Sequence, residues 1–259
     1  MARTTTTEAA GARERAVAWR HATHAAVCDV IERWEYGTLV RCTRLPDFFV
    51  YNGLRVESPV PTLGVDTVVR AADMLLGDLD HRHVEVEDEA AGARLRPGFE
   101  ALGWTSERLV WMSRRGPAPP GPDFEEVPVP ATRGLRMQWS QSYPWTTSAD
   151  AAGRFAKVEE RAAALRGMRA LLARDDSGAP AGFLLFAVAG DAAEIEQVYV
   201  RPALRGRGTG GDLVAAAVRA AGVAETFIVA DDEGDPKRLY ERLGFAPVWR
   251  QHAFRRRPG

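Results

Sequence analysis

The 259-residue sequence has little of the chemistry that marks secreted or membrane proteins. Cys28 and Cys42 are its only cysteines, too few for a disulfide scaffold, and we interpret both as small core residues. The longest unbroken apolar stretch, residues 183–189, is far shorter than the roughly 20 residues that cross a bilayer. The residues after Met1 are polar where a secretory signal needs an apolar segment. We therefore expect a cytoplasmic protein with no membrane partner.

An excess of charge of one sign is also missing. Lysine and arginine together number 34, aspartate and glutamate 35, and the net charge is -1. This balance does not favour binding to nucleic acid or to a membrane surface. Apolar residues make up 46% of the chain, which is enough for well-packed cores. We expect the partner to be a small molecule.

One segment is rich in proline and glycine. It reads Gly-Pro-Ala-Pro-Pro-Gly-Pro over residues 116–122, and repeated prolines remove the backbone donors that helices and sheets need. We therefore predict a domain boundary there. The predicted organisation is a disordered N-terminal tail over residues 1–12, a first domain over 13–115, a linker over 116–123 and a second domain over 124–259.

Hydrophobic periodicity and capping residues predict a mixture of helices and strands. Ser148 and Asp235 are good helix-opening residues because their side chains can accept hydrogen bonds from free amides. Helices are expected over residues 13–34, 65–76, 148–165, 211–221 and 236–243. Strands are expected over residues 37–42, 48–51, 83–87, 109–112, 168–174, 182–188 and 195–200, over 226–230, and in a last segment that ends near residue 254.

Two stretches of the chain repeat one pattern. Residues 98–104, Gly-Phe-Glu-Ala-Leu-Gly-Trp, resemble residues 239–245, Leu-Tyr-Glu-Arg-Leu-Gly-Phe, at an offset of 141. The same offset aligns the expected strand at residues 84–88 with the one at residues 225–229, and residues 109–114 with residues 250–255 in the last strand. Because the order of elements is retained, we interpret the chain as two copies of one fold.

The most informative stretch runs from Val198 to Asp212 and reads Val-Tyr-Val-Arg-Pro-Ala-Leu-Arg-Gly-Arg-Gly-Thr-Gly-Gly-Asp. It passes from an expected strand through glycines into an expected helix. Glycines let the backbone approach a ligand closely, and the first amides of a helix have no internal acceptor. Such a loop is an anion site, to which Arg205 and Arg207 add positive charge, and phosphate is its natural ligand.

A dinucleotide is one phosphate compound that this loop could bind. Gly206, Gly208 and Gly211 satisfy the pattern G-x-G-x-x-G, and Asp231 follows about 20 residues later at the end of the next strand. Residues 201–205 separate the first glycine from the preceding strand, however, whereas the dinucleotide turn is tight. The pattern also comes too late in the chain to be followed by a doubly wound sheet. A dinucleotide-binding oxidoreductase is therefore the weaker alternative.

The same residues resemble a known family. The pattern Arg-x-x-Gly-x-Gly over residues 205–210, preceded by Val-Tyr-Val over 198–200, is similar to the acetyl-CoA motif of GNAT acetyltransferases. Residues 239–245 are similar to their later helix-to-strand motif, and the close match covers about residues 168–254. The resemblance implies an α+β fold of two tandem GNAT-like domains, each a mixed, mostly antiparallel sheet flanked by helices.

The resemblance implies an N-acetyltransferase that moves an acetyl group from acetyl-CoA, its acyl-donor substrate, to a primary amine of a small-molecule acceptor. In this family, the loop amides hold the pyrophosphate and the preceding strand pairs with the pantetheine arm. The resemblance assigns acetyl-CoA binding to Val198, Tyr199, Val200, Arg205, Gly206, Arg207, Gly208, Thr209, Gly210 and Gly211. Glu233 and Pro236 depart from the family pattern, because many relatives have Asn and Ala there. A non-catalytic acyl-CoA-binding or regulatory module is the alternative from a different class.

Acetyl transfer from a thioester to an amine needs a proton acceptor for the amine and a proton donor for the leaving thiolate. Glu194 lies eleven residues before Arg205, where histone-type relatives carry a general base, and Glu196 shares its strand face. The alternative is that both are solvated strand charges. Tyr240 matches the family tyrosine that donates a proton to the cofactor sulfur. Phenol and thiol pKa values, about 10 and about 8.5, are close enough for this transfer.

We expect no metal site. His21 with His24, and His81 with His83, have the spacing of ligand pairs on a helix and on a strand. Neither pair has a third ligand at a recognisable spacing.

The N-terminal copy is expected to be degenerate and not to bind acetyl-CoA. At the offset of 141, residues 64–69 lie opposite 205–210, and a threonine and a valine replace the loop glycines. Branched residues there obstruct the approach of phosphate, and Asp66 repels it. Phe99 lies opposite Tyr240, so the proton donor is missing as well.

Overall fold

The computed structural model describes residues 2–57, 60–142, 146 and 148–257, with side chains in the first helix described from Gly11 onward. The chain divides into two compact units, each discontinuous in sequence. Unit 1 comprises Met1–Trp111, Ala230–Asp235 and Pro247–Gly259, and unit 2 comprises Met112–Val229 and Pro236–Ala246. Both units thus draw on both sides of the proline-rich segment, whose role as a domain boundary stays a prediction. Within the described residues, no helix is long and apolar enough to cross a membrane.

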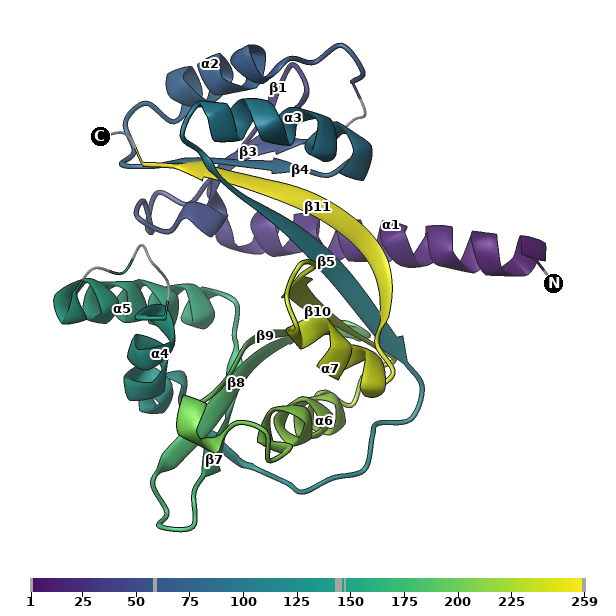
Figure 1. The fold of residues 1–259 in the computed structure, drawn as a ribbon, viewed down its shortest axis with the longest axis vertical. Coiled ribbons are helices and arrows are strands. Elements are labelled where there is room, and N and C mark those ends of the chain that lie inside the picture. The colour runs from purple at the N-terminus through teal and green to yellow at the C-terminus, as the bar shows by residue number, and fades with distance from the viewer. Residues whose placement is uncertain (1, 58–59, 143–145, 147, 258–259) are drawn as a thin grey trace. The chain divides into compact units, whose positions relative to one another are not determined.

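Unit 1 is a mixed sheet flanked by helices (Figure 1). Its strand order is β1-β2-β3-β4-β11-β5. Neighbours among β1, β2 and β3 are antiparallel, β3 and β4 are parallel, and β11 is antiparallel to β4. The elements are α1 (Ala2–Val27), β1 (Val30–Trp34), β2 (Gly37–Arg41), the 3-10 turn η1 (Phe49–Tyr51), β3 (Asn52–Val56), α2 (Val65–Leu75), β4 (Arg82–Val86), α3 (Glu89–Ala101), and most of β5 (Thr105–Arg115) and β11 (Ala246–Arg256).

The apolar core of unit 1 lies between its sheet and helices α2 and α3, which cover the same face (Figure 1). Leu54 of β3 and Val84 of β4 are fully buried there, while their strand neighbours point to the opposite face. Phe254 of β11 joins this core, and its ring stacks on that of Phe99 of α3 with the centroids 4.1 Å apart. The last strand of the chain therefore completes a core that is otherwise made by the N-terminal half.

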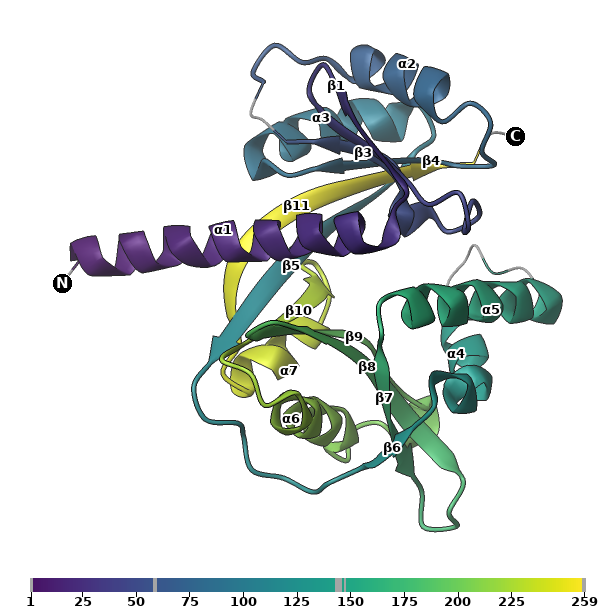
Figure 2. The ribbon, with the colours of Figure 1, turned by 180° about the vertical axis from the view of Figure 1, so that it is seen from behind.

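Unit 2 contains the glycine-rich loop. Its strand order is β5-β10-β9-β8-β7-β6, in which β6 to β9 are antiparallel neighbours and β10 is parallel to β9. Helix α6 packs on β8 and β9 from one face, and α4 packs on them from the other, together with α5 (Figure 2). The elements are β6 (Glu125–Val127), η2 (Val129–Thr132), α4 (Arg133–Ser140), α5 (Ala149–Leu165), β7 (Arg169–Arg174), β8 (Pro180–Ala189), β9 (Ala192–Val200), η3 (Pro202–Leu204), α6 (Thr209–Ala221), β10 (Glu225–Asp231) and α7 (Pro236–Arg242).

Both halves of the sequence show the same order of elements, in which three antiparallel strands precede a helix, a parallel strand, a second helix and a final strand, which is β5 in the first half and β11 in the second. The offset of 141 holds at the end of each copy, since β11 (Ala246–Arg256) begins and ends 141 residues after β5 (Thr105–Arg115). The turns before these strands also match. The amide of Trp104 donates to the carbonyl of Phe99, and that of Phe245 to Tyr240, each at 3.0 Å. The expected α+β class with mostly antiparallel sheets is confirmed, which excludes the doubly wound sheet of a dinucleotide-binding oxidoreductase.

Several elements differ from the prediction. The first helix ends at Val27 instead of near Trp34, because the next residues form β1 and pair with β2; it also reaches back into residues 1–12. The expected strand 48–51 is the turn η1, which is held by Asn52. The Asn52 side-chain amide donates to the carbonyls of Leu45 and Phe48, just before this turn, at 2.8 and 2.9 Å. β1, β6 and α4 were not predicted, because segments this short carry little periodicity. The helix α3 was not predicted either, and it contains Pro97, a residue that normally interrupts a helix.

Replacing Phe254 by Ala should lower the free energy of unfolding by about 3–5 kcal/mol, because the change empties a fully buried position in the unit 1 core. Urea denaturation followed by circular dichroism measures the change. Met74→Ala is the control, because Met74 is 76% exposed, and we expect it to stay within about 0.5 kcal/mol of the parent. A loss below about 1 kcal/mol for Phe254→Ala would contradict the packing of β11 in this core.

Candidate active site

The glycine-rich loop of unit 2 leads from β9 into α6. After the turn Pro202–Leu204 it passes through Gly206 and Gly208, whose φ angles of 80° and 89° lie in the left-handed region that favours glycine. Gly208 is the N-cap of α6 and provides no side-chain cap. The first helical bond runs from the Asp212 amide to the Gly208 carbonyl at 3.0 Å. The three amides from Thr209 onward therefore have no acceptor within the helix.

The loop is uncovered on one side and packed on the other. A Cβ on Gly206 would meet no described atom within 4 Å, and one on Gly208 would meet only a carboxylate oxygen of Asp212, at 3.7 Å. On the packed side, the Cβ position of Gly211 lies 3.2 Å from Leu239 of α7. A phosphate fits this arrangement, because free helix-terminal amides are accessible and the positive end of the helix dipole is near.

Two arginines of the loop add positive charge. Arg205 Nε donates to the Val200 carbonyl at 3.0 Å, and its guanidinium carbon lies 5.8 Å from the centre of the Tyr199 ring. Arg205 is thus folded back on the end of β9. Arg207 is exposed. Both side chains belong to the same loop as the free amides, so they strengthen its preference for an anion.

β9 carries a bulge shortly before the loop. Leu185 of β8 pairs with Glu196 and Phe183 pairs with Tyr199, so β9 has one extra residue between these pairs. Gln197 in this bulge has a φ of 51°, the single positive value for a non-glycine residue in the described chain. A bulge interrupts the ladder of hydrogen bonds, and backbone groups beside it can pair with a ligand instead.

Tyr240, the predicted proton donor, lies in α7 and is buried. Its ring meets that of Phe245 edge-on, with the centroids 6.3 Å apart. The preceding residue, Leu239, is the one that contacts the start of α6 at Gly211. The structure thus brings the helix that carries the predicted proton donor to the glycine-rich loop.

The two candidate bases, Glu194 and Glu196, share one partner. Arg166, at the C-terminal end of α5, donates through Nη2 to Glu194 at 2.8 Å and through Nη1 to Glu196. The side chains of Glu194 and Arg166 are about 95% buried, whereas that of Glu196 is 30% exposed. Glu194 is therefore not the solvated charge of the alternative interpretation. Sequence reasoning missed Arg166, because nothing in the spacing connects it with β9.

A third carboxyl group, which the sequence analysis did not identify, faces the β9 bulge. Glu159 of α5 accepts a hydrogen bond from Gln197 Nε2 at 2.8 Å. Glu159 is 3% exposed, and burial raises its pKa to about 8. A signal was present in the sequence, since Glu159 continues the apolar face of α5 formed by Ala152, Ala156 and Ala163 at helical spacing.

Glu233, where many relatives have Asn, is engaged within unit 1. Arg96 Nη1 donates to Glu233 Oε1 at 2.6 Å, and this hydrogen bond lowers the pKa of the glutamate. Pro236, the other departure, is the first residue of α7. Glu233 thus forms an ion pair with α3, and Pro236 begins a helix.

Unit 1 differs from unit 2 where its second helix starts. α2 begins after Gly64 as α6 begins after Gly208, so the equivalence is displaced by three residues from the ungapped offset. The expectation that Thr67 stands opposite Gly208 is corrected accordingly. The first turn of α2 is Val65-Asp66-Thr67, with an acidic residue and no glycine, in place of Thr-Gly-Gly in α6.

The histidines that were considered as metal-ligand pairs have protein partners in unit 1. His24 Nε2 lies 3.2 Å from the Val50 carbonyl oxygen, and His81 Nε2 lies 3.1 Å from that of Asn52. Burial lowers the pKa of His81 to about 4 and that of His24 well below its ordinary value. His83 Nε2 lies 3.2 Å from a carboxylate oxygen of Glu85.

One other group of potential metal ligands lies in the described part of unit 1. Ligand atoms of His21, Glu57 and Glu87 are within 4.8 Å of one another. His21 Nε2 lies 2.6 Å from Glu87, and Glu57 pairs with Arg33 and Arg55 at 2.5 and 3.0 Å. Two guanidinium groups beside Glu57 already balance the carboxylates, so hydrogen bonds and ion pairs account for this cluster.

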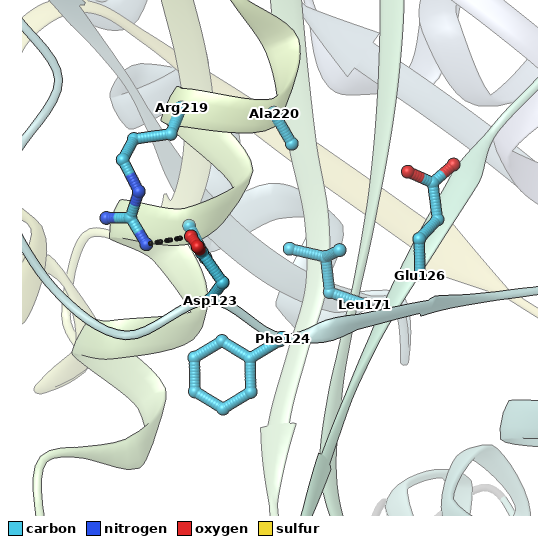
Figure 3. A pocket seen from close by; sticks show the side chains of 7 residues that line it. Asp123, Phe124, Glu126, Leu171, Arg219 and Ala220 are labelled. Atoms are coloured by element: carbon cyan, nitrogen blue, oxygen red, sulfur yellow. Dashed lines mark hydrogen bonds and ion pairs between the residues drawn. The ribbon is translucent and has the colours of Figure 1, made fainter.

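A surface hollow of about 320 Å³ lies against the C-terminal half of α6, away from the glycine-rich loop at its start (Figure 3). Arg219 of α6 donates there to Asp123 at 3.1 Å and to the Pro119 carbonyl at 2.9 Å. The hollow is therefore where the proline-rich segment docks on unit 2. Its lining residues are Asp123, Phe124, Glu126, Leu171, Ala216, Arg219 and Ala220.

Comparison with known proteins identifies the domain that contains this loop. The family model of the acetyltransferase (GNAT) domain matches residues 166–247. No curated protein shows a significant match to the chain. The matched segment extends from β7 through the loop to the helix that carries Tyr240.

Solved structures share the fold at low sequence identity. A functionally unknown conserved protein from Staphylococcus epidermidis has a TM-score of 0.71 at 15% identity, over 90% of this chain and 95% of its own. A GCN5-related N-acetyltransferase from Kribbella flavida has a TM-score of 0.60 at 16% identity, over 95% of each chain. A tandem GNAT protein from the clavulanic acid biosynthesis pathway has a TM-score of 0.51 at 17% identity, over 75% of this chain and 70% of its own.

The family match and the shared fold agree with the resemblance drawn from the loop and from residues 239–245. The chain therefore carries a GNAT acetyltransferase domain in residues 166–247, and this domain makes it an acyltransferase.

Proposed function

We propose that the chain transfers an acetyl group from acetyl-CoA to a primary amine of a small-molecule acceptor. The observation that supports this most directly is the start of α6, where Gly208 adopts a left-handed conformation and the first three amides have no acceptor within the helix. Amides at a helix N-terminus bind phosphate oxygens, and coenzyme A presents a pyrophosphate. The GNAT domain accounts for acyl transfer in general, whereas the acetyl donor and the amine acceptor are the proposed part.

The donor is proposed to bind along β9 and the loop. Backbone groups of Val198, Tyr199 and Val200 follow the bulge at Gln197 and are proposed to pair with the pantetheine arm, as the resemblance implies. The loop is proposed to hold the pyrophosphate through the side chains or amides of Arg205, Gly206, Arg207, Gly208, Thr209, Gly210 and Gly211.

The chemistry proposed for the site is direct attack of the amine on the thioester that acetyl-CoA supplies. Backbone amides of β9 beside the bulge are proposed to stabilise the developing oxyanion. Tyr240 is proposed to give its phenol proton to the departing thiolate. Glu194 or Glu196, or a water that one of them orients, is proposed to take the proton from the amine. Glu196 is the more accessible of the two, and Arg166 fixes the position of both.

Unit 1 is proposed not to bind the donor. Its corresponding helix start lacks the two glycines of the first turn and carries Asp66, whose negative charge at that turn disfavours phosphate. Phe99 occupies the place of Tyr240 in the matching turn, so no phenol is available there. What unit 1 retains is a packed core and the pairing of its sheet with β11.

Gly208→Val should abolish acetyl-CoA binding, measured by isothermal titration calorimetry. A branched side chain cannot readily adopt the left-handed φ of 89°, so the loop amides are displaced. Gly178→Val is the matched control: Gly178 also has a left-handed φ, 81°, and open space around its Cβ position, but lies in the turn between β7 and β8. The control should keep the parent affinity, and equal affinities in all three proteins would rule out the loop as the binding site.

Tyr240→Phe should lower kcat by roughly one to three decades and leave acetyl-CoA affinity nearly unchanged, because only a proton donor is lost. Release of free thiol, followed with the best amine from a panel, measures kcat. Tyr36→Phe in unit 1 is the control and should match the parent. If Tyr240→Phe also retains the parent kcat, the phenol has only a packing role.

Calorimetry should give one acetyl-CoA per chain, because the start of α6 has the glycines and positive charges that suit a pyrophosphate and the equivalent start of α2 does not. Arg205→Glu combined with Arg207→Glu should then remove all binding, since opposite charges at the loop repel phosphate. Asp66→Asn, which alters only the start of α2, should leave the stoichiometry and the affinity of acetyl-CoA binding at their parent values. Two sites per chain, or binding that survives the double substitution, would contradict this assignment.

A further inference from the structure

Glu159 and Gln197 form a buried contact between α5 and the β9 bulge. Gln197 Nε2 donates to Glu159 Oε1 at 2.8 Å, and Glu159 is 3% exposed. Gln197 is also the residue with the positive φ of 51°. A non-glycine residue keeps such a backbone conformation only where its surroundings hold it there, and this side-chain contact is one of the restraints.

Each side chain of this contact has one buried oxygen atom without a hydrogen-bond partner in the described part of the chain. Within the described residues, Glu159 Oε2 and Gln197 Oε1 are both buried and have no hydrogen-bond partner. An ionised carboxylate can only accept hydrogen bonds, and so can an amide oxygen, so an ionised Glu159 leaves both Glu159 Oε2 and Gln197 Oε1 unsatisfied. A carboxylic acid has an O–H group that can donate to the amide oxygen while its carbonyl accepts from the amide nitrogen. One proton on Oε2, donated to Gln197 Oε1, would satisfy both unpartnered atoms.

The charges around Glu159 also favour this proton. Arg136 of α4 is fully buried and donates to Glu160 Oε1 at 2.5 Å, whereas its Nη1 lies 3.6 Å from Glu159 Oε2, beyond hydrogen-bond distance. Its remaining donors go to Thr132 Oγ1 at 3.1 Å and to a backbone carbonyl of α5. Arg133, also on α4, pairs with Glu160 as well. From β9 the group that faces Glu159 is the uncharged amide of Gln197.

The buried guanidinium thus already has one carboxylate, Glu160, in direct contact. A second negative charge on Glu159 would be desolvated without a hydrogen-bonded cation of its own, which is unfavourable in a dry interior. Burial is the main reason why the pKa of Glu159 is raised to about 8, and the nearby Glu160 carboxylate acts in the same direction, while Arg136 and Gln197 oppose it.

We propose that Glu159 is a positioning residue that carries a proton at neutral pH and forms a reciprocal carboxyl–carboxamide pair with Gln197, which holds the β9 bulge in place. The pair acts on catalysis through the backbone beside the bulge, which is where the donor and the oxyanion are proposed to bind. This catalytic consequence rests on the proposed acetyl transfer. The protonation of the pair does not depend on it.

Loss of the proton breaks the pair, so stability depends on pH in a defined direction. The folded-state pKa of Glu159, about 8, lies above its ordinary value of 4.5. The stabilisation is therefore complete below about pH 4.5 and is lost as the pH rises through about 8. Glu160 behaves oppositely, because its hydrogen bond with Arg133 is the first of several that lower its pKa. Its contribution is present above its ordinary pKa and is lost as the pH falls.

Glu159→Gln tests the pair, because glutamine has the shape of the protonated acid and cannot ionise. The melting temperature of this variant should rise relative to that of the parent between about pH 4.5 and pH 8 and keep a constant lead above that range. Glu160→Gln is the matched control on the same helix. It should melt below the parent at neutral pH, with a difference that shrinks in acid. A Glu159→Gln variant that melts below the parent at pH 7 would show an ionised, salt-bridged Glu159 and overturn the proposal.

Turnover distinguishes positioning from base catalysis. Glu159→Gln should keep kcat within about threefold of the parent at pH 7, and the ratio of its kcat to that of the parent should rise above about pH 8. Glu159→Ala, which cannot form the pair, should lose about tenfold or more. A loss of roughly a hundredfold or more in Glu159→Gln at pH 7 would identify Glu159 as an ionised base and overturn the proposal. If no protein in the series transfers acetyl groups, the proposed function fails, and the melting comparison still decides the protonation.

Discussion

Unit 1 depends on the pairing of β11 with β4. The last strand of the chain inserts between β4 and β5, and Phe254 from this strand stacks on Phe99 at the centre of the unit 1 core. The polar backbone of a strand in such a position needs partners on both sides, and its inward side chains need a core. Residues from both ends of the sequence must therefore meet before unit 1 is complete. The GNAT motifs of unit 2 lie between these two ends in the sequence.

The face of β9 toward α4 and α5 carries polar side chains before the bulge, whereas Tyr199, beyond the bulge, belongs to an apolar core with residues of α4. Arg166 pairs there with Glu194 and Glu196, and Gln197 bonds to Glu159. Buried polar groups are unfavourable unless hydrogen bonds satisfy them, so these partners restrict where β9 and α5 can lie against each other. The same contacts place three carboxyl groups close to the bulge. Burial raises the pKa of one of the three, Glu159, to about 8.

The two copies diverge where chemistry is expected and agree where packing is needed. The turn that ends in Trp104 and the turn that ends in Phe245 have the same hydrogen bonds, because both must lead a helix into a buried strand. The starts of α2 and α6 share only the N-cap glycine, and the residues after it are Val-Asp-Thr in one copy and Thr-Gly-Gly in the other. A uniform offset fails there, because loop length is not constrained by the core. The N-cap glycines Gly64 and Gly208 are 144 residues apart, so the offset of 141 misaligns these two helix starts by three residues.

The sequence by itself determined the fold class, most helices and strands of unit 2 and the position of the glycine-rich loop. These follow from local signals: hydrophobic period, helix caps such as Ser148, and glycines at positions where φ is positive, such as Gly208. Only the tertiary structure decided that β11 belongs to unit 1, that Arg166 bridges the two candidate bases, and that Glu159 faces the bulge. The physical reason is that strand pairing, burial and hydrogen bonding between residues distant in the sequence leave no local pattern. A glutamate on the apolar face of a helix is visible in the sequence, but its partner is defined only by packing.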